Sequence, residues 1–79
     1  MKIFITLKLF ATLKSYEPYG VDTDQYPVQP GMTIQDLVDE LGMHDKEAKL
    51  IFVNGVRVPR DMVLQGGERV GIFPPVGGG

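Results

Sequence analysis

The residues best suited to chemistry end the chain, where Gly77, Gly78 and Gly79 follow a short apolar run. Glycine has no Cβ, so such a tail can enter a narrow tunnel in another protein and place a terminal carboxylate there. The four residues beyond Pro75 span at most about 13 Å when fully extended. We therefore expect Gly79 to be the reacting residue and Val76, Gly77 and Gly78 to be held by a partner. A frayed, glycine-rich end is the alternative that composition leaves open.

A tail of this kind needs a rigid base, and the preceding residues predict one. Pro74 and Pro75 lack a backbone N–H and hold φ near about −65°, so they end sheet pairing and direct the chain outward. Residues 69–73 predict the final strand, after a polar turn at 65–68. We expect one domain over residues 1–75 and a flexible tail over 76–79.

The first part of the chain predicts two strands. Aliphatic residues alternate with polar or aromatic ones over residues 2–9, which is typical of a strand with one apolar face. Residues 10–14 favour a helical turn, and residues 15–24 favour a loop. A second strand is expected near residues 25–29. Because Pro27 would remove one hydrogen-bond donor from the ladder, this strand should lie at an edge of the sheet.

A short helix is expected next. Thr33 is the predicted N-cap, Asp36 stands three residues later in an imperfect capping box, and Gly42 is the predicted left-handed C-cap. The apolar residues between the caps follow helical spacing, at Ile34, Leu37, Val38 and Leu41. One stripe of this helix should therefore face the core.

The dipeptide Asn54–Gly55 separates the apolar runs 50–53 and 56–58, which predicts a tight hairpin. With the final strand, the order becomes strand, strand, helix, strand, strand, strand. This order predicts an α+β fold of the β-grasp (ubiquitin-like) type, a mixed sheet of about five strands with one main helix. The first and last strands should be parallel neighbours at its centre.

Composition excludes several classes of function. The chain has 79 residues, a formal net charge of −2 and no cysteine. Such a charge gives no basis for binding nucleic acid or an anionic membrane, and there is no thiolate and no disulfide framework. His44, Asp45 and Glu47 are interpreted as a solvated surface, so no metal site is predicted. No apolar stretch is long enough to span a membrane, and we expect a cytoplasmic protein that is monomeric when free.

One helix can cover only one face of a sheet, yet residues 50–53 are apolar at every position. We therefore expect the uncovered face to bind a partner, through Phe4, Phe73, Pro74 and Pro75. The alternative is that the loop after the first strand folds over this face and makes these residues part of the core.

Three arginines, Arg57, Arg60 and Arg69, fall on or beside the predicted strands of the second half of the chain. They either steer an acidic partner or keep the strands soluble. The sequence leaves both interpretations open.

The ending from Phe73 to Gly79 resembles that of the ubiquitin-like sulfur carriers of the MoaD/ThiS family, and most closely the MoaD group, the small subunits of molybdopterin synthase. Residues 8–13, 53–55 and 65–70 are also similar to this group, so the resemblance covers nearly the whole chain. The terminal block is its specific part, whereas Asn-Gly hairpins are common. Gly77 is a departure, because it makes three glycines in a row, but it leaves the final pair in place.

The resemblance implies a sulfur carrier without a catalytic site of its own. The Gly79 carboxylate would be adenylated, with ATP, by a ubiquitin-activating-type adenylyltransferase (MoeB/ThiF-like) and converted to a thiocarboxylate. The tail would then donate sulfur inside the large subunit of molybdopterin synthase (MoaE-like), in molybdenum or tungsten cofactor biosynthesis. No stably bound cofactor is implied. The alternatives are sulfur transfer for thiamine thiazole synthesis, a ubiquitin-like modifier that forms an amide with a lysine, and a plain interaction domain.

Overall fold

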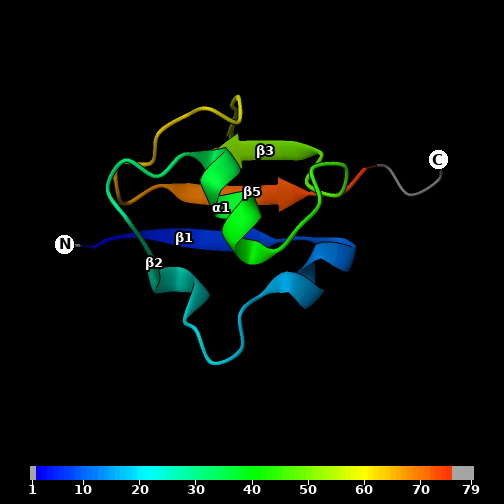
Figure 1. Cartoon of the computed structure of the whole chain (residues 1–79), viewed down its shortest axis with the longest axis horizontal. Helices are drawn as coiled ribbons and strands as arrows, with labels where there is room; N and C mark the ends of the chain where they lie inside the picture. The colour runs from blue at the N-terminus through cyan, green and yellow to red at the C-terminus, as the bar shows by residue number, and fades with distance from the viewer. Residues whose placement is uncertain (1, 76–79) are drawn as a thin grey trace.

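In the computed structural model, which describes residues 2–75, one α-helix lies across one face of a mixed five-stranded sheet (Figure 1). The expected reacting residue Gly79 and the expected tail residues Val76, Gly77 and Gly78 lie outside the described residues. The predicted boundary between domain and tail therefore stays a prediction.

The sheet has the predicted β-grasp arrangement. Its strands are β1 (Ile3–Leu9), β2 (Tyr26–Val28), β3 (Leu50–Val53), β4 (Val56–Arg57) and β5 (Arg69–Phe73), in the spatial order β2-β1-β5-β3-β4. β1 and β5 are parallel, with Leu7 opposite Val70, and the other neighbouring pairs are antiparallel. The strand that leads into the tail is therefore the central one, paired on both sides.

β2 is an edge strand, as Pro27 predicts, and Pro27 lies opposite Phe4 of β1. The expectation of a plain loop over residues 15–24 is wrong at both ends. A 3-10 helix, η1 (Ala11–Tyr16), runs two residues past the predicted turn, where the Tyr16 ring packs against the core and its hydroxyl donates to the Glu47 carboxylate. A second one, η2 (Thr23–Gln25), forms where the Asp22 carboxylate accepts the Asp24 backbone N–H at 2.9 Å.

The helix α1 (Ile34–Leu41) has the predicted caps. Its capping box is complete: Thr33 Oγ1 accepts the Asp36 N–H at 3.1 Å, and the Asp36 carboxylate accepts the Thr33 N–H at 3.0 Å. Gly42 ends the helix in the left-handed region, with φ 80°. These caps satisfy backbone groups that would otherwise lack partners at the helix ends.

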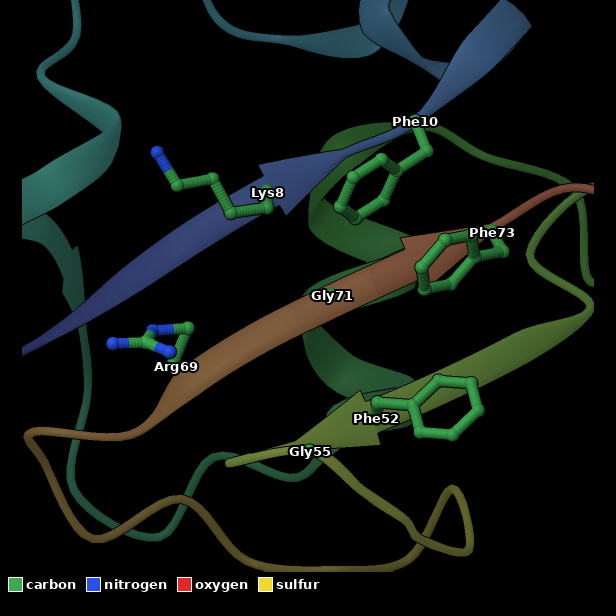
Figure 2. A pocket seen from close by; sticks show the side chains of 7 residues that line it. All are labelled: Lys8, Phe10, Phe52, Gly55, Arg69, Gly71 and Phe73. Carbon is green, nitrogen blue, oxygen red and sulfur yellow. The ribbon is translucent and has the colours of Figure 1, made fainter.

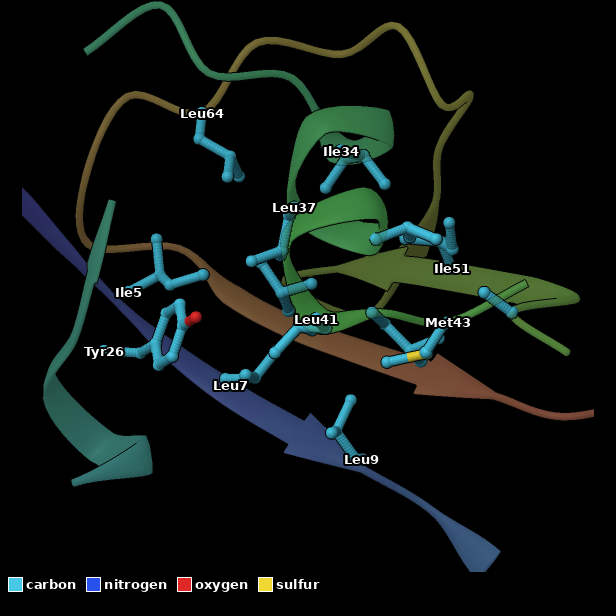
Figure 3. Close-up of a cluster of buried hydrophobic side chains, with 14 of the residues drawn as sticks. Ile5, Leu7, Leu9, Tyr26, Ile34, Leu37, Leu41, Met43, Ile51 and Leu64 are labelled. Carbon is cyan, nitrogen blue, oxygen red and sulfur yellow. The ribbon is translucent and has the colours of Figure 1, made fainter. Parts of the chain in front are cut away.

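The core lies between α1 and the sheet (Figure 3). Its fully buried aliphatic side chains come from every layer and include Ile5, Leu7, Leu13, Ile34, Leu37, Leu64, Val70 and Ile72. On β1 and β5 these residues alternate with exposed or half-buried ones. The helix therefore covers one face of the central strands and leaves the other face open.

Candidate functional site

The open face of the sheet is not covered by the loop that follows β1. Phe4 is 46% exposed and Phe10 is 37% exposed, whereas Ile5 is 1% exposed on the other face. The loop meets β1 at its side, where Lys8 Nζ lies 3.3 Å from an Asp24 carboxylate oxygen. The open face therefore stays available to a partner. The alternative prediction, in which the loop after the first strand folds over this face, is wrong.

Three aromatic rings gather on this face around Gly71, and we call this group the aromatic cradle (Figure 2). The rings of Phe10 and Phe73 are stacked, with centroids 4.2 Å apart and planes within 2°. Phe52 meets Phe73 edge to face, with centroids 5.6 Å apart and planes at 83°. Both arrangements are favourable for aromatic pairs, so the three rings hold one another in place.

Gly71 forms the floor of the cradle. A Cβ at this position would lie 3.4 Å from Phe10 Cε2 and 3.7 Å from a ring carbon of Phe73. These are ordinary van der Waals distances, so the two rings lie close over the backbone of β5 and the missing side chain leaves the floor of the pocket open. A larger residue here would occupy the space that a partner's side chain could use.

The cradle is part of a pocket of about 310 Å³ whose other lining residues are Lys8, Gly55 and Arg69. Figure 2 shows the rings at one end and the side chains of Lys8 and Arg69 toward the other. The start of β5 is fixed there, because the Arg69 backbone N–H donates to the Asn54 side-chain oxygen at 2.9 Å. Lys8 is already paired with Asp24, whereas Arg69 has no ion pair within residues 2–75. An apolar end near Arg69 suits a partner's hydrophobic side chain with a carboxylate nearby.

The cradle adjoins the base of the tail. Phe73 is the last residue of β5, and its C=O accepts the Lys49 N–H at 3.0 Å. Pro74, half-buried, and Pro75, exposed, follow directly. A protein that docks on the cradle would therefore meet the point from which the tail leaves the sheet.

The structure brings together some of the predicted interface residues and adds others. Phe73 is in the cradle, and Phe4 is on the same face but does not line the pocket. Sequence reasoning missed Phe10 and Phe52. Phe10 could have been found by extending the alternation of β1, because Phe4, Lys8 and Phe10 are all at even-numbered positions and so share one face. Phe52 could have been found from its place between two core residues of β3, which puts its side chain on the opposite face. Their role in binding stays a prediction.

The side chains with shifted pKa values do not line the cradle. The hydrogen bond from the Tyr16 hydroxyl to the Glu47 carboxylate, at 2.7 Å, raises the pKa of Tyr16 and lowers that of Glu47. Burial, together with a hydrogen bond to Glu40, raises the pKa of Tyr26 to about 12. These groups support the fold.

Glu47 also accepts the His44 backbone N–H at 3.1 Å, so this carboxylate has a structural use. Within residues 2–75 there is no group of three or more His, Cys, Asp or Glu side chains that could hold a metal ion. The same part of the chain has no helix of the length and hydropathy needed to cross a membrane.

Comparisons with known proteins identify a family and similar structures for this chain. A model of the ThiS family matches residues 7–79. A solved structure of a Pyrococcus furiosus protein, assigned as molybdopterin converting factor, subunit 1, is 29% identical with a TM-score of 0.61, over 94% of this chain and 99% of that chain. No curated protein matches the chain.

Two structures from Haloferax volcanii show the same fold. The HVO 2177 protein is 23% identical with a TM-score of 0.73, over 99% of this chain and 88% of that chain. SAMP1 is 22% identical with a TM-score of 0.62, over 95% of this chain and 98% of that chain. At these identities the likeness concerns the fold alone.

Proposed function

Because this chain belongs to the ThiS family of ubiquitin-like sulfur carriers, we propose that Gly79 carries sulfur as a C-terminal thiocarboxylate. In the first step the Gly79 carboxylate attacks the α-phosphate of ATP, pyrophosphate leaves, and an acyl-adenylate forms. A sulfur nucleophile supplied by a donor then attacks the carbonyl carbon, and AMP leaves with the electron pair of the broken C–O bond. With hydrosulfide (HS⁻) as that nucleophile, the attack itself leaves Gly79 as a thiocarboxylate. A persulfide donor would first give an acyl disulfide, whose S–S bond a thiol reductant must then cleave.

The observation that carries this proposal is the position of the aromatic cradle. Phe73 belongs to the cradle and is two residues before Pro75, the last residue before the predicted tail. A partner bound at the cradle would hold the tail close to its own active site, which converts the reaction of the tail into an effectively intramolecular event. The rigid sheet would supply the docking energy, and the narrow glycine tail would supply the reach.

The proposed function requires two classes of partner. One is a ubiquitin-activating-type adenylyltransferase that binds the ATP and carries out the activation. The other is the enzyme that accepts the sulfur, and we propose the large subunit of molybdopterin synthase. The likeness to the Pyrococcus furiosus molybdopterin converting factor subunit, at 29% identity over 99% of that chain, supports this choice.

A thiazole-forming acceptor, as in thiamine synthesis, is the second candidate, and the match to the ThiS family supports it. Both candidates share the same activated tail, so the acceptor enzyme decides between them. Thiocarboxylated protein should be offered separately to a molybdopterin synthase large subunit with its pterin precursor and to a thiazole synthase with its substrate. Sulfur transfer in only the thiazole reaction would exclude the molybdopterin role.

The test of sulfur loading is the intact mass of the full chain after incubation with ATP, the host's adenylyltransferase and a sulfur donor. We expect a gain equal to the replacement of one oxygen by sulfur, located in the C-terminal peptide. Deleting Gly79, or adding a C-terminal tag, should abolish the gain while circular dichroism shows an unchanged fold. An isopeptide-linked product would instead identify a modifier. If the mass is unchanged although the adenylyltransferase is demonstrably active, the chain does not carry sulfur on Gly79.

A further inference from the structure

A second pocket lies along the outer part of β3, separate from the aromatic cradle. Its volume is about 430 Å³, and its lining residues are Lys49, Ile51, Arg57, Val58, Pro59 and Arg60. We call it the basic pocket, because three of the six residues are cations. We propose that the basic pocket binds an acidic segment of a partner protein through that segment's carboxylate side chains.

Arg60 gives the basic pocket one rigid wall. Its Nη2 donates to the backbone C=O of Asp45 at 2.8 Å and to that of Ala48. These two bonds fix the guanidinium plane before any ligand arrives, so less side-chain entropy is lost on binding.

The other end of the same guanidinium lacks an acceptor. Arg60 Nη1 is buried and has no hydrogen-bond partner within residues 2–75. An Asp45 carboxylate oxygen lies 3.9 Å from it, which is beyond hydrogen-bond distance. Because Nη1 has almost no accessible surface, a partner's carboxylate cannot bond to it directly, and Arg60 attracts that carboxylate through its positive charge.

Lys49 and Arg57 add charge that the fold does not neutralise. Neither forms an ion pair with any residue in the described range, 2–75. The whole chain has 8 Lys and Arg against 10 Asp and Glu, so three cations in one pocket stand against the overall balance. Such a local excess attracts anions and directs their approach.

The lining favours a peptide over a nucleic acid. Ile51, Val58 and Pro59 supply apolar wall between the cations, which fits the methylene groups of glutamate side chains and a peptide backbone. Nucleic-acid sites usually spread positive charge over a wider basic surface, whereas this chain is net negative.

The basic pocket adjoins the strand end that carries the tail, since the Lys49 backbone N–H bonds to the Phe73 C=O. A partner with an acidic segment could therefore hold the basic pocket and the aromatic cradle at once. This inference does not depend on the chemistry of Gly79. The basic pocket could fail to bind an acidic segment although Gly79 carries sulfur, and it could bind one although Gly79 does not.

The test is a titration of a hexaglutamate peptide into the 15N-labelled full chain, followed by NMR. We expect saturable shifts at Lys49, Arg57 and Arg60, which weaken as salt is added. The double variant Lys49→Gln/Arg57→Gln should bind about tenfold more weakly. Arg60 is left unchanged because its bonds to two carbonyls support the fold.

The matched control is Lys2→Gln/Lys14→Gln, which removes the same charge from exposed positions outside the basic pocket. Its affinity should equal that of the unchanged protein. The proposal is overturned if both double variants lose affinity equally, if shifts are absent or lie elsewhere, or if hexathymidylate binds the pocket more tightly than hexaglutamate.

Discussion

The two faces of the sheet differ sharply, although the same strands build both. On β1, Leu7 is 0% exposed beneath the helix, and Phe4 is 46% exposed on the opposite face. β5 repeats the contrast, with Val70 and Ile72 buried and Phe73 half-buried. The covered face is mostly aliphatic, with Tyr26 as its buried aromatic residue, whereas the open face carries three aromatic rings with Lys8 and Arg69 nearby.

This difference indicates that the covered face stabilises the fold and that the open face is suited to binding a partner. Aliphatic residues on the covered face lose all contact with water and stabilise the fold. The open face keeps large apolar groups partly in water. Such groups do not help a small domain to fold, and they are typical of a binding surface. Mutations on the two faces should therefore affect different measurements.

The largest expected effect is on the covered face. Leu7→Ala should lower the free energy of unfolding by about 2 to 5 kcal/mol, because it removes a fully buried side chain and leaves a cavity. Urea denaturation followed by circular dichroism measures this loss. Phe4→Ala, on the open face of the same strand, should cost less than about 1 kcal/mol. Comparable losses of stability for the two variants would contradict the proposal that the two faces have different roles.

A smaller effect is expected in binding. Phe10→Ala removes one ring of the cradle, so affinity for the host's adenylyltransferase should fall by about tenfold or more. Tyr19→Ala is the control, since Tyr19 is a fully exposed aromatic outside the cradle. Calorimetric titration gives both affinities. If Phe10→Ala binds as tightly as the control, the cradle is not the docking site.

The smallest effect concerns Tyr26, whose ring is buried beside the core and whose hydroxyl donates to Glu40 at 2.9 Å. Its pKa is raised to about 12 from 10.0, so the fold favours the neutral phenol. This contribution is complete below about pH 10 and is lost as the pH rises toward about 12.

Urea unfolding of the unchanged protein and of Tyr26→Phe between pH 9 and 12 measures this contribution. At pH 9 the variant should be less stable by about 1 kcal/mol, through the lost hydrogen bond. The difference should shrink as the pH rises. A difference that is constant across this range would show that ionisation of Tyr26 is not linked to folding.

Much of the fold could be predicted because its signals are local. Thr33, Asp36 and Gly42 define the ends of α1 by capping alone, and Asn54–Gly55 sets the hairpin. The two 3-10 helices were harder to predict. They depend on packing of Tyr16 against a distant core and on a short side-chain bond at Asp22.

The candidate site was predictable only in part. Phe73 was expected at the interface from its place beside the tail, whereas Phe10 was predicted to belong to a helical turn. Its ring reaches the site because β1 and β5 are parallel neighbours, which brings residues 10 and 73 together. Such a contact has no signature in either segment taken alone.

The sequence by itself determined the order of elements, the helix caps, the edge position of β2 and the glycine ending, because each depends on residues close together in the chain. The tertiary structure decided which residues share a surface. It stacked Phe10 on Phe73 over Gly71, and it gathered Lys49, Arg57 and Arg60 at one pocket. These groupings arise from strand pairing between distant segments, and strand pairing sets neighbours that no local pattern specifies.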